Sequence, residues 1–455
     1  MRRFRALPLL ALIASAPALA EPAAADIARL LEEMQGRLAR LEARNAELER
    51  QFGALAEVEA QEHAMTNRLK DLEINVSSLR EQARRIETLS GVSVGASMTM
   101  VAQKASRVAP GTDASQLNYR GDVSVTLPAG EIGESQGRLF THFRLGQGAG
   151  VSLPPTLTGG ANSTTFQHTN PDDTAAALAQ AWYQLDVPLD GNGRAAKSHL
   201  EINFGKIDPF VFFDQNRLAD DESEGFLNNV FVHNPLLDSG GDAGVDSYGF
   251  SPGMRLAYHS DGPDSGWWRA SLGVFGSGPG ASFSGGLKQP FVIGQLEMTH
   301  SLLPGREAGY RLYAWRNGRA LALDGVTEER HAGWGVSLDQ QVGDHLALFG
   351  RYGQSSSGQV GFDRALTLGG QLDGSGWGRA DDRVGLALGW LRSSADYRAL
   401  NPGFSGAEKQ AELYYVWQAN DQFHLSPSVQ WISRPGGDPA AKSVSVVGLR
   451  AKVSY

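Results

Sequence analysis

The chain has 455 residues, a net charge of −9 at pH 7 and a mean hydropathy of −0.27. This hydropathy is too low for a bundle of membrane-spanning helices, but it suits a barrel whose strands alternate lipid-facing and water-facing residues. The absence of cysteine excludes disulfides and thiolate metal sites, and the acidic balance gives no reason to expect nucleic acid as a partner.

The N-terminus has the three parts of a secretory signal peptide. Three of the first five residues are arginine, residues 6–16 are apolar, and Ala18-Leu19-Ala20 is a typical cleavage sequence. The apolar run is too short to span a membrane. We therefore predict a signal peptide over residues 1–20, with cleavage after Ala20.

Residues 21–90 have a helical pattern. Apolar residues spaced alternately by four and three positions form a heptad seam, and a second run repeats this spacing with a shift. The first run is Ile27, Leu31, Met34, Leu38, Leu41, Asn45, Leu48, Phe52 and Leu55, and the second is Met65, Leu69, Leu72, Val76, Leu79, Ala83 and Ile86. We predict a periplasmic coiled coil that joins copies of the chain, as a dimer or a trimer. A folded-back hairpin of the two runs is the alternative.

From residue 91 to the C-terminus the pattern has period two. In the last segment Val447, Leu449, Ala451, Val453 and Tyr455 are apolar, and the residues between them are small or polar. About fifteen such segments can be counted, and bacterial single-chain barrels have even strand numbers. We predict that residues 91–455 form an all-β transmembrane barrel of sixteen antiparallel strands in the outer membrane, with the α-helical coiled coil before it. A soluble propeller is the alternative, but no blade repeat is visible.

The connections between these segments are expected to be alternately short and long, with short turns in the periplasm and long loops outside the cell. We expect one turn at Pro128-Ala129-Gly130 and a Gly-rich loop between Tyr352 and Val384. The acidic and aromatic segment from Asp208 to Tyr248 does not have a strand pattern. It is either a loop folded into the lumen or an ordinary surface loop, and loops of this length are usually functional or disordered.

Several motifs carry a resemblance to a known family. They are Gly205-Lys206-Ile207-Asp208-Pro209, Phe213-Asp214-Gln215-Asn216, the block from Asp220 to Asn228, His233-Asn234-Pro235, the stretch from Tyr248 to Gly253, the stretch from Leu425 to Ile432 with Arg434-Pro435-Gly436-Gly437, and Gly448-Leu449-Arg450. As a set they resemble the carbohydrate-selective porins of the OprB type, over residues 91–455. The resemblance implies a sixteen-stranded outer-membrane channel through which sugars diffuse. The chain departs from the family pattern at Arg434 and at Ser223-Glu224-Gly225, which puts the preferred sugar in doubt.

If the apolar strand residues face lipid, charged residues between them face the lumen and can hydrogen-bond sugar hydroxyls. The candidates for substrate binding are Arg144, Glu201, Lys206, Arg255, Glu297, Arg311, Arg351, Arg383, Glu412 and Arg450. For any one of them, the competing reading is a salt bridge that only stiffens the barrel wall.

The sequence contains no persuasive catalytic set, so we expect a channel and not an enzyme, with no cofactor. The histidines are scattered without metal-ligand spacing, so no metal site is predicted. The acidic run from Asp220 to Glu224 is a candidate for Ca²⁺, although such runs are more often a solvated face or a loop anchor. The alternatives to a sugar porin are a porin for anions, metal chelates or siderophores, and an envelope tether that acts through the coiled coil.

Overall fold

The computed structural model describes residues 32–33, 36–37, 44, 91–166, 173–190, 196–246, 248–261, 266–278, 281, 287–299 and 302–455. The chain divides into two compact units, Met1–Arg85 and Ile86–Tyr455. In the first unit the described residues are helical, and Arg37 donates a hydrogen bond to Glu33 at 2.8 Å. The predicted signal peptide and the seam residues of both heptad runs lie outside the described residues, so the coiled coil stays a prediction. Within the described part of the chain, no helix is both long and apolar enough to cross a membrane.

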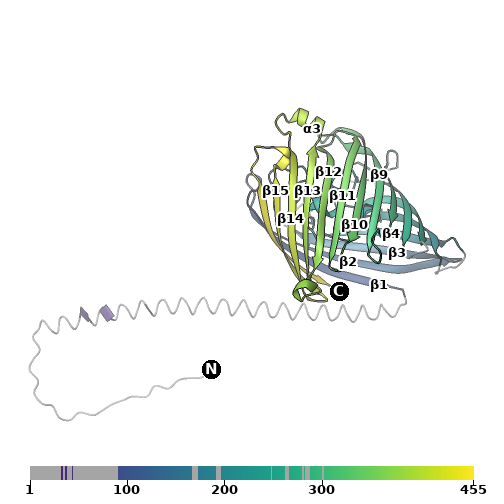
Figure 1. Ribbon diagram of the computed structural model, residues 1–455, viewed down its shortest axis with the longest axis horizontal. Coiled ribbons are helices and arrows are strands. Elements are labelled where there is room, and N and C mark those ends of the chain that lie inside the picture. The colour runs from purple at the N-terminus through teal and green to yellow at the C-terminus, as the bar shows by residue number, and fades with distance from the viewer. Residues whose placement is uncertain are drawn as a thin grey trace, which may run out of the picture. The chain divides into compact units, whose positions relative to one another are not determined.

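The second unit contains a closed barrel of sixteen antiparallel strands, as the sequence predicts (Figure 1). Each strand pairs with its neighbours in the chain, and the last pairs with the first. The strands are β1 (Ser93–Ala105), β2 (Ser115–Ile132), β3 (Ser135–Gln147), β4 (Ala175–Pro188), β5 (Ser198–Ile207), β6 (Ser251–Asp261), β7 (Trp267–Phe275), β8 (Phe291–Met298), β9 (Ala308–Leu321), β10 (Glu328–Gln341), β11 (Leu346–Ser357), β12 (Phe362–Asp373), β13 (Arg383–Ser393), β14 (Ala407–Asn420), β15 (Phe423–Ser433) and β16 (Val444–Ser454).

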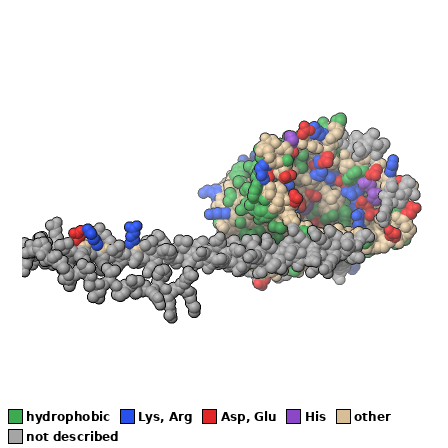
Figure 2. All heavy atoms as spheres, turned by 90° about the horizontal axis from the view of Figure 1, so that it is seen from below, with side chains coloured by type: hydrophobic (Ala, Val, Ile, Leu, Met, Phe, Trp, Pro, Cys, Tyr) green, Lys and Arg blue, Asp and Glu red, His purple; other side chains and the backbone are tan. Residues whose placement is uncertain are grey.

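The period-two pattern determines which side of each strand faces outward. On β15, Val429 and Trp431 are about half exposed, whereas the alternating Ser428 and Gln430 are buried inside the barrel. Figure 2 views one end of the barrel and shows hydrophobic side chains gathered on its outer flank, with acidic and basic ones in the hollow. This arrangement suits a barrel in lipid, where the outer face must be apolar.

The C-terminal strand closes the barrel. Tyr455 exchanges two backbone hydrogen bonds with Ala96 of β1, at 2.7 and 3.0 Å. Closure leaves no strand edge with unpaired N–H and C=O groups, which lipid cannot satisfy.

Two local predictions are wrong. The expected Gly-rich loop between Tyr352 and Val384 contains β12, whose apolar alternation is masked by the Gly369-Gly370 pair. The expected turn at Pro128 is instead a register irregularity within β2, and the chain turns after Ile132. In both cases residues that usually mark turns lie inside a paired strand: Gly369 and Gly370 in regular register, and Pro128 next to an irregular position.

The barrel has two different ends. The end at which β2 turns into β3, β10 into β11 and β14 into β15 is called the short-turn end. The opposite end carries the long connections between β3 and β4 and between β5 and β6. Both the start of β1 and the end of β16 lie at the short-turn end, because the barrel has an even number of strands.

Three further helical turns lie in connections. These are η3 (Gly374–Trp377), α3 (Ala395–Leu400) and η4 (Pro435–Gly437). They stand at the ends of strands.

Candidate functional site

The connection between β5 and β6, residues 208–250, packs inside the barrel and is called the inward loop. It contains η2 (Pro209–Val211) and one turn of helix, α2 (Asn229–Val232). A hydrophobic core joins the loop residues Phe210, Phe213, Phe226, Phe231 and Leu236 to the wall residues Tyr313, Trp315, Phe349, Leu391 and Tyr414. Of the two placements that the sequence left open for this segment, the structure has the one inside the barrel.

Inward-facing glycines on the wall make room for the inward loop. A Cβ atom at Gly353 would lie 2.5 Å from the side chain of Asn234, and one at Gly335 would lie equally close to it. At Gly389 a Cβ atom would lie 3.0 Å from Val230 of α2. A larger residue at these positions would therefore displace the loop or strain the wall.

Asp214 is fully buried and is the centre of the loop's polar anchoring. Its carboxylate accepts hydrogen bonds from the Tyr313 hydroxyl at 2.6 Å and from Arg351 Nε at 3.2 Å. Arg351 also donates to the backbone carbonyls of Asp214 and Phe231, at 3.0 and 2.9 Å. The φ angle of Asp214 is 57°, which non-glycine residues seldom adopt, so these bonds hold an uncommon backbone conformation.

A second group of wall residues holds the acidic part of the inward loop. The Glu412 carboxylate accepts the backbone N–H groups of Leu227 and Asn228, each at 2.9 Å. Arg450 donates to the carbonyl oxygens of three loop residues within 222–225, at 2.8 to 2.9 Å. Backbone groups that would be unsatisfied in the lumen are therefore paired with charged side chains of the wall.

The acidic run from Asp220 to Glu224 is bound by cations of the protein itself. Glu224 pairs with Arg383 at 2.6 Å and with Lys452, and Glu222 pairs with Arg120. These contacts make Glu222 and Glu224 anchors of the inward loop, whereas Asp220 Oδ1 is buried without a hydrogen-bond partner in the described part of the chain.

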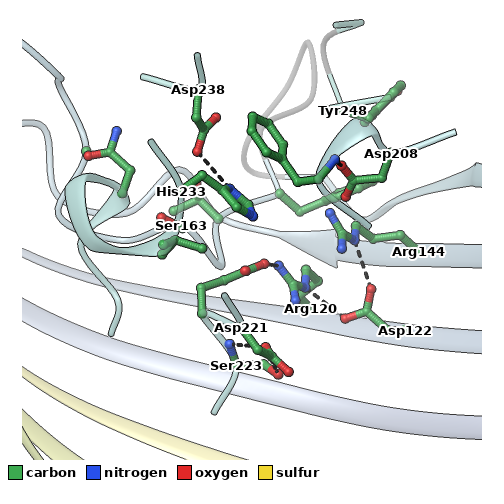
Figure 3. Close-up of a pocket in the computed structure, with 18 of the residues that line it drawn as sticks. Arg120, Asp122, Arg144, Ser163, Asp208, Asp221, Ser223, His233, Asp238 and Tyr248 are labelled. Carbon is green, nitrogen blue, oxygen red and sulfur yellow. Dashed lines mark hydrogen bonds and ion pairs between the residues drawn. The ribbon is translucent and has the colours of Figure 1, made fainter. Parts of the chain in front are cut away.

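Between the inward loop and strands β1–β3 and β16 lies a cavity of about 850 Å³ (Figure 3). The wall contributes Ser97, Arg120, Asp122, His142, Arg144 and Lys452. The inward loop contributes Asp208, Phe210, Asp220, Asp221, Glu222, His233 and Asp238, among others. The connection between β3 and β4 closes a further side with residues 158–166. The hydrophobic core packs the inward loop against strands on the other side of the barrel, and this cavity lies between the loop and strands β1–β3 and β16.

The wall side of the cavity is an alternating set of charges on two paired strands. Asp122 of β2 stands opposite Arg144 of β3 in the register. Its carboxylate lies 2.8 Å from each of Arg120 Nε, His142 Nε2 and Arg144 Nε. Arg144 makes this bond through Nε, so its two terminal nitrogens take no part in it. Figure 3 shows the Arg144 side chain beside the cavity.

The loop side of the cavity opposes this wall with carboxyl groups and an imidazole. Burial opposes ionisation of Glu222, but the guanidinium groups of Arg120 and Arg144 hold its pKa below the usual range. Burial raises the pKa of Asp220 to about 7, against the opposing effect of His233. The cavity is thus lined by fixed donors and fixed acceptors of both signs.

His233 of the inward loop has a carboxylate beside each of its ring nitrogens. Its Nδ1 lies 3.2 Å from Asp238 and its ring stacks on Phe210 with 4.0 Å between ring centroids. Burial opposes protonation of the ring, but Asp238 and Asp220 outweigh it and raise the pKa of His233 to about 9. The ring is therefore a cation at neutral pH that ties two parts of the inward loop together.

The structure places the ten predicted lumen residues in three groups. Arg144 lines the cavity, and Lys206 pairs with Asp246 of the inward loop at 2.8 Å. Four others, Glu201, Arg255, Glu297 and Arg311, bond to one another or to neighbours on the wall. The last four, Arg351, Arg383, Glu412 and Arg450, bind the inward loop. Whether any of the ten contacts a solute stays a prediction.

The second group belongs to a continuous row that we call the wall ion chain. It consists of Arg255, Glu201, Arg269, Glu297, Arg311 and Asp339. Its closest contacts are 2.6 to 2.8 Å, and the contact between Arg269 and Glu201 is 3.8 Å. Each buried charge of the wall ion chain has an opposite charge on an adjacent strand. These contacts are salt bridges within the barrel wall, the alternative to substrate binding at these positions.

The sequence analysis did not single out Arg120, Asp122, His142, Asp208 or His233 as candidates. The wall residues could have been found in the sequence, because ionisable residues two positions apart, at 120 and 122 and at 142 and 144, lie on the same face of a strand. The loop residues have no such period, and only the packing of the inward loop brings them to β2 and β3.

Comparison with known proteins agrees with this architecture. Residues 67–455 match the family described as carbohydrate-selective porin, OprB family. OprB of Pseudomonas putida, solved at high pH, is 19% identical, with 82% of this chain and 97% of that chain covered and a TM-score of 0.64. The Acinetobacter baumannii outer-membrane channel DcaP is 12% identical, with 80% of this chain and 97% of that chain covered and a TM-score of 0.46. Among curated proteins no sequence matches significantly.

The fold and the family are those of outer-membrane porins, which are channels and not enzymes. The chain belongs to the carbohydrate-selective porin, OprB family, because the match covers all but the N-terminal part. The matched region begins at residue 67, within the second heptad run of the predicted coiled coil.

Proposed function

We propose that the protein lets small hydrophilic solutes, and carbohydrates in particular, diffuse passively across the outer membrane along the charged cavity. The family membership supports a carbohydrate channel. The observation that carries the proposal is the pairing of wall and loop, with Arg120, Asp122 and Arg144 on one side and Glu222 and His233 on the other. Sugar hydroxyls both donate and accept hydrogen bonds, so such a lining offers them many weak contacts.

The mixed signs of the lining favour neutral solutes over anions. Arg120 and Arg144 are each bonded to the Asp122 carboxylate at 2.8 Å, and Glu222 pairs with Arg120 from the loop. A selective anion path would need a ring of unopposed cations. Here each cation near the cavity stands beside a carboxylate, so the lining has little net attraction for either sign.

We also propose the domain organisation and location that the sequence suggests. Residues 1–20 act as a signal peptide, residues 21–90 form a periplasmic coiled coil that holds a homo-oligomer such as a trimer, and residues 91–455 form the porin domain. The heptad seam supports the coiled coil, because an apolar seam has to be buried on another helix. Deleting residues 23–90 tests this: a smaller oligomer that still conducts is expected, and loss of envelope attachment alone would favour the tether alternative.

Liposome swelling tests the solute. We expect faster swelling with mono- and disaccharides than with organic anions of equal size, and equal rates for size-matched solutes would overturn the carbohydrate proposal. Arg144→Gln should slow the swelling with sugars, since it removes a charged hydrogen-bond donor from the cavity. Arg138→Gln is the matched control: it lies on the same strand nearer the short-turn end, pairs with Asp186 and is about half exposed.

A further inference from the structure

A group of histidine and carboxylate side chains lies on the inner wall, away from the charged cavity. It consists of His199 and Glu201 on β5 and His259 on β6. His199 and His259 are direct cross-strand partners, close to where β5 begins and β6 ends, at the short-turn end. The intervening Leu200 and Tyr258 point to the other face of the sheet, so the three polar side chains face the lumen. Figure 2 shows histidine side chains beside basic ones on the hollowed face of the barrel.

From this geometry we propose that His199, Glu201 and His259 bind a divalent transition-metal ion such as Zn²⁺, Ni²⁺ or Cu²⁺. Their ligand atoms all lie within 4.8 Å of one another. His199 Nε2 is 3.4 Å from Glu201 Oε1. Metal–ligand bonds of about 2.1 Å in a tetrahedral site place ligand atoms about 3.4 Å apart. Small side-chain rotations therefore suffice to bring all three groups onto one ion.

The two imidazole rings are already arranged side by side. Their centroids are 4.7 Å apart and the planes differ by 27°. Trp267 packs against the His259 ring at 5.0 Å and limits its rotation. Two neutral imidazoles and one carboxylate are a donor set that Zn²⁺, Ni²⁺ and Cu²⁺ prefer, whereas Ca²⁺ and Mg²⁺ prefer oxygen ligands only.

Neighbouring charges set the electrostatics of the proposed site. Arg255 donates to Glu201 Oε2 at 2.7 Å, which leaves Oε1 directed toward His199 and orients the carboxylate. Arg269 lies 3.8 Å from the same Oε2 and is neutralised by Glu297 at 2.6 Å. Asp261 lies 3.1 Å from His259 Nε2 and can supply a fourth ligand or a compensating charge. The ion would therefore not stand in a field of unopposed cations.

Spacing along the sequence does not reveal this set. His199-Leu200-Glu201 and His259-Ser260-Asp261 are separated by the whole inward loop, and only the register of β5 with β6 joins them. An ion there would add positive charge to the lumen wall near the short-turn mouth. We expect bound metal to reduce the single-channel current, with recovery on addition of a chelator.

The test uses the purified full-length protein in detergent and in planar bilayers. Titration with Ni²⁺ and Zn²⁺ by calorimetry should give one site per chain, and Mg²⁺ should not compete. His199→Ala and His259→Gln should each weaken binding at least about tenfold and abolish the metal effect on current. The matched control is His345→Ala, which removes a histidine in another short turn that is paired only with Asp373 in the described contacts.

Two results would overturn the proposal. One is the absence of stoichiometric binding by the wild-type protein. The other is an equal loss of affinity in the His345 control, which would point to nonspecific surface histidines. Heat-dependent mobility on gels shows whether each variant is folded, and Co²⁺ absorption of the wild-type protein reports the coordination geometry of the bound ion without any substitution.

Discussion

The wall of the barrel has two sectors that use buried charge differently. In strands β5–β10 the wall ion chain pairs charges mainly between neighbouring strands, and it also contacts the inward loop where Asp339 pairs with Arg217 and Arg269 donates to Gln215. In strands β11–β16, Arg351, Arg383, Glu412 and Arg450 instead bind backbone or side-chain groups of the inward loop. The same sequence signal, a charge between two apolar residues, therefore has two roles. Which role a residue takes depends on whether the acidic and helical parts of the inward loop lie over it.

This comparison predicts that the two sectors respond differently to substitution. Charges that bind the inward loop should change the pore when they are removed, because the loop bounds the cavity. Charges of the wall ion chain should change barrel stability and leave the pore nearly unchanged.

The largest effect is expected for Arg351→Met. The substitution leaves the buried Asp214 carboxylate without its cation and removes the donor to two loop carbonyls. Loss of one partner from a buried ion pair typically destabilises a protein by about 3–5 kcal/mol. Here the loss would weaken the docking of the inward loop on the wall. We expect larger and noisier single-channel currents and faster proteolysis within residues 208–250. Arg364→Met, at an exposed position of β12, is the control, and an unchanged current in Arg351→Met would contradict the anchoring role.

A smaller effect on the loop is expected for Gly353→Ala. The new Cβ atom would lie 2.5 Å from the Asn234 side chain, so the loop or the strand has to shift. Overpacking of this kind typically costs about 1–3 kcal/mol. Bilayer recordings should show altered conductance. Gly361→Ala is the control, since nothing lies within 4 Å of its added Cβ atom. Equal behaviour of the two variants would show that the glycine is not needed for loop packing.

Glu297→Gln tests the wall ion chain. The carboxylate accepts from Arg269 at 2.6 Å and from Arg311 at 2.8 Å, but Arg311 keeps Asp339 as a second partner. We therefore expect a loss of about 1 kcal/mol in the free energy of unfolding, measured by denaturant titration, with unchanged conductance. A changed conductance with unchanged stability would reverse the assignment of roles to the two sectors.

The pH dependence of loop docking should be the weakest effect. The pKa of His233 is raised from 6.5 to about 9. Its contribution to the stability of loop docking is therefore complete below pH 6.5 and is lost as pH rises through 9. The pKa of Asp220 is raised from 3.8 to about 7, so ionisation of this buried group disfavours docking as pH rises toward 7, and the change above pH 7 belongs to His233. Current noise should increase between pH 7 and 9, and His233→Gln should remove most of this change. His345→Gln is the control, and a pH profile that is the same in both variants would exclude His233.

Much of the barrel was predictable from local pattern. The alternation that ends in Tyr455 predicts an outward apolar face, and the strand count follows from about fifteen visible segments and the even strand numbers of bacterial single-chain barrels. β12 was missed because Gly369-Gly370 interrupts the apolar alternation that marks a strand. Inward-facing charges such as Arg144 and Arg351 were predictable for the same reason as the strands, since side chains alternate between the two faces.

The sequence by itself determined the barrel, because strand periodicity is a local property of neighbouring residues. Only the tertiary structure decided which inward charges line the cavity, which join the wall ion chain and which hold the inward loop. Those roles depend on contacts between residues far apart in the chain, such as Asp214 with Arg351 and Glu222 with Arg120. The loop's path is set by its hydrophobic core and by the glycines that make room for it, and neither has a period that sequence reading detects.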